Sequence, residues 1–161
     1  MSTVESRLKE LGLTLPEPLK PPNGIALPFP WIRVHGSRAF ISGHGPQNPD
    51  GSLAGPFGKV GRDLTVEEAY QSARLTGLSI LGSLKRELGD LERVNAWLKI
   101  LGMVNSAPDF KQLPSVINGF TDLIVDLYGP ERGLHARSAV GMVQLPFDIP
   151  VEIEGEVEIR T

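Results

Sequence analysis

Hydrophobic and polar residues alternate most regularly at the end of the chain. Residues 151–160 read Val-Glu-Ile-Glu-Gly-Glu-Val-Glu-Ile-Arg, so apolar residues and glutamates occupy alternate positions. Because successive side chains of a strand point to opposite faces of a sheet, this pattern predicts a strand with one apolar face. The other face carries four glutamates, Glu152, Glu154, Glu156 and Glu158. Another strand is expected at residues 136–145, followed by a turn at residues 146–150.

Apolar residues recur every three or four positions in other segments, which is the period of a helix. One helix is expected to begin near Asp63 or Thr65 and to end at Gly89, and Thr65 and Glu68 match a capping box. A second helix with a wide apolar face is expected at residues 108–128. A short helix is expected near the start of the chain, at residues 3–11.

The remaining short apolar segments are predicted strands, separated by segments rich in turn-forming residues. The expected strands are residues 32–34, 38–42, 91–104 and a short one at 59–61. A tight turn at residues 35–37 joins the first two as a hairpin. Residues 43–58 are dense in Gly, Pro, Asn and Asp, which predicts a loop.

The order of these elements predicts the fold class. Two or three strands, a helix, a strand, a helix and two final strands are typical of an α+β domain with helices on one face of a mixed sheet. A chain of 161 residues has the usual length of one domain, which we expect to span residues 1–161. Within it, residues 1–24 are expected to form an N-terminal extension, a short helix followed by a proline-rich tether.

Composition narrows the classes of function. The net charge is −3 and the Lys and Arg residues are scattered, whereas nucleic-acid binders usually carry a concentrated basic patch. No cysteine is present, which removes disulfides and thiol nucleophiles. No apolar segment approaches the ~20 residues that span a bilayer, and the N-terminus does not resemble a signal peptide. We therefore expect a cytoplasmic protein with no membrane or nucleic-acid partner.

Metal or cofactor chemistry has no positive support in the sequence. The three histidines, His35, His44 and His135, lack the spacing of metal ligands. Glycine-rich phosphate-binding motifs and nucleophile motifs are also absent from the sequence. We expect no metal and no cofactor.

Arg137 is the first candidate site residue. It lies near the start of a predicted strand whose other residues are small or apolar, including Ala139 and Gly141. A guanidinium presents a rigid fork of donors that suits a carboxylate, and small neighbours leave room for a ligand. The other interpretation is that Arg137 forms an internal ion pair with one of the many glutamates. Local sequence does not decide between them.

Glu152, Ser42 and Gly43 are the next candidates. If residues 136–145 and 151–160 form a hairpin, Glu152 is not directly opposite Arg137, so the two would cooperate across a subunit boundary or across a ligand. Glu152 can equally belong to a solvated sheet face. Ser42 and Gly43 offer a hydroxyl and accessible backbone N–H groups at the end of a strand, or form an ordinary exit into a loop.

Several of these residues together resemble one known family. Ser42-Gly43 after a strand, Asn118 in the second helix, Ala-Arg-Ser-Ala-Val-Gly at 136–141, Leu145-Pro146 and Val-Glu-Ile-Glu at 151–154 resemble the Rid/YjgF-like proteins. The resemblance implies a chorismate-mutase-like α+β subunit with two helices packed on one face of a mixed sheet. It also implies a homotrimer with ligand-binding clefts between subunits.

The resemblance further implies an activity and a set of site residues. The best-known activity of the family is hydrolysis of reactive enamines and imines to 2-oxo acids and ammonia, without metal or organic cofactor. Arg137 matches the arginine that holds the substrate carboxylate, and Glu152 matches a glutamate proposed to position or activate water. Ser42 and Gly43 match residues at the cleft, and Asn118 matches a residue near it.

The chain also departs from the family pattern. The cysteine often found two residues after the arginine is Ala139 here, and the aromatic residue expected before the first strand is displaced, so that Phe29 or Trp31 can substitute. The longer N-terminus and residues 45–58 can reshape or cover the cleft. An alternative function is therefore a trimeric protein that binds 2-oxo-acid-like molecules, as a sensor or chaperone-like protein, without turnover. Ribonuclease activity, an older assignment for some relatives, is disfavoured by the acidic balance.

Overall fold

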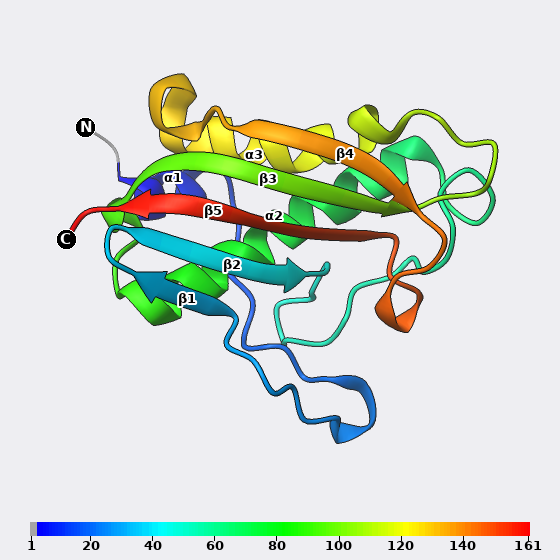
Figure 1. Cartoon of the computed structure of the whole chain (residues 1–161), viewed down its shortest axis with the longest axis horizontal. Helices are drawn as coiled ribbons and strands as arrows, with labels where there is room; N and C mark the ends of the chain where they lie inside the picture. Colours follow the sequence, from blue (N-terminus) through cyan, green and yellow to red (C-terminus); the bar gives the residue numbers. More distant parts are fainter. Residues whose placement is uncertain (1–2) are drawn as a thin grey trace.

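The computed structural model describes residues 3–161, so the first two residues of the expected N-terminal extension lie outside the described part. Three α-helices and five strands make up the fold (Figure 1). The helices are α1 (Val4–Glu10), α2 (Val66–Leu88) and α3 (Leu113–Gly133). The strands are β1 (Ile32–His35), β2 (Arg38–His44), β3 (Val94–Asn105), β4 (Ala136–Met142) and β5 (Val151–Ile159).

The five strands form one mixed sheet with the order β1-β2-β5-β3-β4. Strands β3 and β4 are parallel, whereas the other neighbours are antiparallel. Helices α2 and α3 lie side by side across one face of this sheet, and the other face is left open (Figure 1). This confirms the predicted α+β fold with two helices on one face of a mixed sheet.

The alternation at the end of the chain determines which face of β5 is buried. Its apolar residues point toward the helices and are at most 2% exposed: Val151, Ile153, Val157 and Ile159. Helix α3 approaches the sheet closely at Gly102 of β3, where a Cβ would lie 2.6 Å from Ile117. The glutamates of β5 consequently lie on the open face.

The hairpin considered for the last two strands is wrong. Strand β5 lies between β2 and β3, and β4 pairs in parallel with β3 at the edge of the sheet. The 3₁₀ turn η3 (Pro146–Asp148) carries the chain from the edge strand past β3. A central position lets the apolar face of β5 pack under α2 while both of its edges are paired, and this long-range gain outweighs the shorter connection of a hairpin.

Some predicted boundaries differ from the structure: the strand expected at residues 91–104 begins at Val94, after the 3₁₀ turn η2 (Leu91–Arg93), and the one expected at 136–145 ends at Met142. Residues 59–61 do not form a strand; Val60 makes only isolated bridges, to Leu64 and Ser106. The second long helix begins at Leu113 rather than residue 108, because Pro114 fits the first helical turn, which needs no amide donor. The expected end of that helix is confirmed, because Gly129, with a positive φ of 75°, breaks the helical path and a separate short turn follows up to Gly133.

The N-terminal segment is attached to the core. Val4 and Leu8 of α1 are buried, and the chain then runs toward β1 with only the 3₁₀ turn η1 (Pro22–Gly24) on the way. The amide of Glu17 donates to Pro49 O at 2.9 Å, and the amide of Lys20 donates to Gly51 O at 3.0 Å. These bonds fix the proline-rich segment along the loop of residues 45–58.

Candidate functional site

Arg137 lies on the edge strand β4, on the face of the sheet that the helices cover. It pairs in register with Ile100, which is fully buried under those helices. The guanidinium donates to Asn118 Oδ1 at 2.7 Å, to Thr121 Oγ1 at 3.0 Å and to Pro114 O at 3.4 Å. All three acceptors belong to α3, so one helix fixes the orientation of the arginine.

The acceptors around Arg137 are uncharged. None of the ion pairs formed by residues 3–161 involves Arg137, so the internal pairing with a glutamate is not what the structure contains. The side chain is only partly buried. Because these partners are neutral, no group they supply balances the charge of the partly exposed guanidinium, which can pair with an anionic group from outside the chain. Its fork of donors suits a carboxylate.

Thr121 and His135 extend this arrangement, and the sequence pattern did not identify either as a site residue. His135 Nε2 lies 3.0 Å from Thr121 Oγ1, and its Nδ1 lies 2.8 Å from Gly133 O. Burial lowers the pKa of His135, and the nearby charge of Arg137 lowers it further. A neutral His135 therefore adds no second positive charge beside Arg137. Thr121 is three residues after Asn118, and this helical spacing was the available signal.

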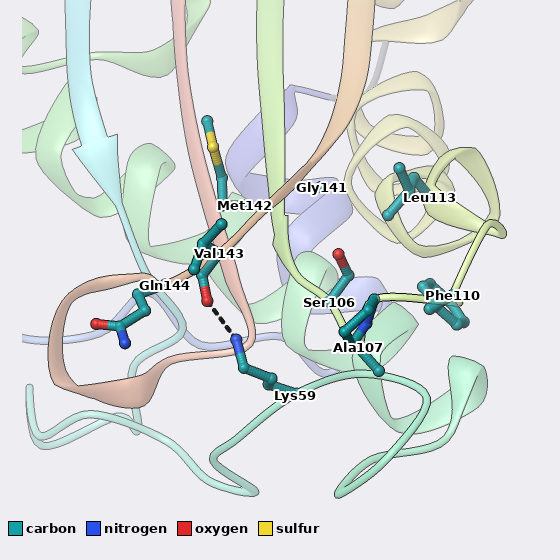
Figure 2. A pocket seen from close by; sticks show the side chains of 10 residues that line it. Lys59, Ser106, Ala107, Phe110, Leu113, Gly141, Met142, Val143 and Gln144 are labelled. Atoms are coloured by element: carbon teal, nitrogen blue, oxygen red, sulfur yellow. Dashed lines mark hydrogen bonds between the residues drawn. The ribbon is translucent and has the colours of Figure 1, made fainter.

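A pocket of about 380 Å³ opens beyond the small residues that follow Arg137 on β4. Ala139 and Gly141 share the face of Arg137, and Gly141 lines this pocket together with Leu113 of α3 and Ser106 (Figure 2). Lys59 points across it and donates to Val143 O (Figure 2). It also donates to Asn105 Oδ1 at 2.8 Å. Among residues 3–161, Lys59 has no carboxylate partner. The sequence did not identify Lys59 as a candidate.

Glu152 lies on the opposite face of the sheet. Its neighbours Val151 and Ile153 point toward the helices, so its own side chain points to the open face. There it covers Gly43, where a Cβ would lie 2.6 Å from Glu152 Oε2. Burial raises the pKa of Glu152, and the charge of Glu154 raises it further. A carboxylate with raised proton affinity suits general-base chemistry near neutral pH.

A second pocket, of about 250 Å³, adjoins Glu152. Its walls are almost entirely apolar and include two of the predicted residues, Trp31 and Gly43, together with Phe29. Phe29 and Trp31 meet edge to face, with ring centroids 5.4 Å apart. Glu152 is the only ionisable residue among those that line this pocket. We call it the Glu152 chamber.

Ser42 is close to the Glu152 chamber but does not line it. Its hydroxyl donates to Pro30 O at 2.8 Å, and its amide donates to Trp31 O at 3.0 Å. Ser42 therefore fixes the segment that carries the aromatic residues. The neighbouring His44 is buried between Ser42 O and Ser83 Oγ, and burial lowers its pKa to about 4.

The predicted site residues thus fall into two groups. Arg137, Asn118 and Ala139 lie at the β4 edge under the helices, whereas Glu152 and Gly43 lie on the open face, where Trp31 lines the same chamber. Residues 3–161 contain no cluster of three His, Asp or Glu side chains that could hold a metal ion. Over the same residues, no helix is long and apolar enough to cross a membrane.

Comparison with known proteins gives consistent matches over nearly the whole chain. Residues 5–150 match the family described as "YjgF/chorismate mutase-like, putative endoribonuclease". The chain is 37% identical over 157 residues to the protein TCP17 of Trypanosoma cruzi, covering 98% of this chain and 94% of the relative.

Solved structures agree with this match. The protein Atu1372 of Agrobacterium tumefaciens, of unknown function, is 39% identical with a TM-score of 0.86, covering 99% of this chain and 93% of that one. A "putative endoribonuclease" from Shewanella oneidensis is 30% identical with a TM-score of 0.87, covering 98% of this chain and 100% of that one. The YjgF product of E. coli, 18% identical with a TM-score of 0.60, shares the fold over 92% of this chain and 98% of that one.

Proposed function

Because the chain belongs to the YjgF/chorismate mutase-like family, we propose that it hydrolyses reactive imines and enamines of 2-amino acids to 2-oxo acids and ammonia. One observation carries the proposal. The guanidinium of Arg137 is fixed by three neutral oxygens of α3 and keeps its charge for a carboxylate from outside the chain. Such substrates carry a carboxylate next to the carbon that reacts.

The proposed site is shared by two subunits of a homotrimer. Within one chain the sheet separates Arg137 from Glu152, so a substrate on Arg137 meets the carboxylate of a neighbouring copy. The edge strand β4 is flanked by two exposed apolar residues, Leu134 (60% exposed) and Val143 (84% exposed). Exposed apolar residues at both ends of a strand whose outer edge is unpaired support a contact with another copy there.

In the proposed reaction, Arg137 holds the carboxylate of the iminium form and a water molecule attacks the imine carbon. A carbon–oxygen bond forms while Glu152 accepts a proton from the water. Glu152 then returns this proton to the nitrogen, the carbon–nitrogen bond breaks and ammonia leaves. The hydroxyl transfers its proton to this ammonia as the carbonyl forms, so the products are the 2-oxo acid and ammonium. An imine carbon is already electrophilic, so positioning and one proton relay suffice without a metal or cofactor.

A direct experiment generates 2-aminoacrylate from serine with a dehydratase and follows loss of the enamine and imine with and without this protein. We expect acceleration that Arg137→Ala abolishes. Arg137→Lys retains the charge but loses the fork, and is expected to restore only part of the rate. Absence of acceleration, or equal acceleration by Arg137→Ala, would contradict the proposal.

A second candidate is binding of 2-oxo acids without turnover. It is favoured by Ala139, which stands where relatives often carry a thiol, so that this group is absent from the proposed site. Calorimetric titration with 2-oxo acids separates the candidates. Binding that Arg137→Ala weakens, together with no imine hydrolysis, would support the second candidate over the first.

A further inference from the structure

The Glu152 chamber is lined mainly by segments that lie outside the α-helices and strands. Leu19, Leu27 and Phe29 come from the segment that precedes β1, and Leu53 comes from the loop of residues 45–58. The third segment is the turn η3, which contributes Phe147. Three separate segments thus converge on the carboxylate of Glu152.

Hydrogen bonds hold the segment before β1 and the loop of residues 45–58 together. Gln47 donates from its side chain to Glu17 O at 3.0 Å, in addition to the amide bonds of Glu17 and Lys20 to the loop. Gly51 packs so closely that a Cβ would lie 2.3 Å from Pro18 O. The apolar wall is therefore fixed in place before any ligand arrives.

Phe147 stands at the edge of the chamber in an unfavourable backbone conformation. Its φ is 58°, in the left-handed region, and the side chain is still 41% exposed. The following residue, Asp148, also has a positive φ and is held by two contacts. Gly58 donates its amide to Asp148 O at 2.8 Å, and Asn105 donates to Asp148 Oδ1 at 3.2 Å. A bulky residue keeps such a conformation only where its surroundings impose it, and this is common at ligand-binding sites.

The chemistry of the lining restricts what the chamber accepts. No cation lines it, so a second acidic group on the ligand has no partner there, and Glu152 is positioned to act on the reacting end. An apolar cavity of about 150 Å³ accommodates a benzene ring. The volume of about 250 Å³ is ample for a phenyl or branched aliphatic group. The edge-to-face pair Phe29–Trp31 is suited to a third aromatic ring.

From this geometry we infer that the substrate carries a bulky apolar side chain, aromatic or branched, which occupies the Glu152 chamber and is selected by the N-terminal segment. This inference rests on the proposed function, because the side chain is located relative to a carboxylate on Arg137. A filled chamber also excludes bulk water from Glu152 and leaves room for the reacting water alone. The N-terminal segment is thereby a determinant of specificity in addition to part of the fold.

The experiment compares phenylpyruvate with pyruvate as bound products, and the imines of phenylalanine and alanine as substrates, on the full chain. We expect the phenyl compound to bind at least about tenfold more tightly and to show a similarly higher kcat/KM, the size of discrimination that an apolar pocket achieves. Leu27→Asn and Leu19→Asn each place an amide in the wall and should reduce this ratio roughly fivefold. The matched control is Ile25→Asn, since Ile25 lies in the same segment, is 47% exposed and does not line the chamber.

The outcomes separate this inference from the proposed function. The inference is supported if the phenyl compound binds more tightly and if this preference is lowered by the two leucine variants and unchanged by Ile25→Asn. This holds even if no imine is hydrolysed, because the absence of hydrolysis would overturn the proposed reaction alone. Equal affinity for phenylpyruvate and pyruvate overturns the inference. The proposed function still stands in that case if the protein hydrolyses any imine. A preference that survives both leucine variants also overturns it.

Discussion

Arg137 and Glu152 lie on opposite faces of one sheet, on strands that are separated by β3. Arg137 pairs with Ile100 on the covered face, and Glu152 pairs with Met103 on the open face. A sheet is a continuous layer of backbone and side chains, so no small ligand reaches both residues of the same chain. If both act on one substrate, as we propose, the subunit is only half of the site.

The support of Arg137 by α3 gives the first prediction. Thr121→Val removes one of three acceptors and frees the guanidinium to rotate, which should raise KM roughly threefold to tenfold with little change in kcat. Steady-state kinetics on an imine substrate measures this split. The matched control is Ser115→Ala on the exposed surface of the same helix, which should leave KM unchanged. A Thr121→Val protein with normal KM would show that Asn118 and Pro114 suffice to hold the arginine.

The close contact between Gly43 and Glu152 gives the second prediction. Gly43→Ala places a methyl group where Glu152 Oε2 lies, at 2.6 Å, so the carboxylate must move. Since a displacement of about 1 Å can cost 100-fold in rate, we expect kcat to fall between roughly tenfold and 100-fold. The melting temperature should change little, because the displaced group is a partly exposed side chain. Unchanged kcat would place the reacting water away from this oxygen.

The raised pKa of Glu152 predicts the acid limb of the pH–rate profile. The base is active when deprotonated, so kcat should fall as pH decreases through a value above the ordinary glutamate pKa of 4.5. The raised pKa of Glu152 has the opposite effect on the stability of the fold, which should increase as pH decreases. Folding favours the protonated carboxyl, so the ionised group lowers stability at neutral pH and this cost disappears at low pH. Glu152→Gln should therefore unfold at a higher temperature than the native chain at pH 7, with the difference vanishing in acid.

The lowered pKa of His44 predicts that the stability of the fold decreases as pH decreases. Burial chiefly lowers its pKa from 6.5 to about 4, so the folded state disfavours protonation relative to the unfolded chain. Stability should be constant above the unfolded value and should decline as pH falls from about 6.5 to about 4. Thermal unfolding across this range measures the decline. His44→Gln should flatten the curve between these values, and an equally steep curve in that variant would assign the dependence to other groups.

Local patterns predicted the elements but not every neighbour. The apolar alternation of residues 151–159 and the capping box at Thr65 are local signals, and the structure confirms β5 and α2. The insertion of β5 between β2 and β3 could not be predicted in this way. It depends on burial of one face of β5 under α2 and on pairing with β2 and β3, all of which are distant in sequence.

The sequence named candidate site residues one by one but did not predict how they are arranged. Arg137 and Glu152 follow from their positions in strands that resemble a known family, whereas their opposite faces follow from the strand order. Lys59 and Thr121 were missed because their roles depend on contacts across the fold, to Val143 O and to Arg137. The Glu152 chamber was also not foreseeable in detail, since it is formed by segments without regular structure.

Mixed assemblies test the central claim, that Arg137 of one subunit and Glu152 of another form one site. Arg137→Ala and Glu152→Gln are each expected to be inactive alone, and the two variants are unfolded, mixed in equal amounts and refolded together. In randomly assembled trimers, about a quarter of the shared sites combine an intact Arg137 with an intact Glu152, so about a quarter of native activity should return. Activity no higher than that of the separate variants would contradict the account.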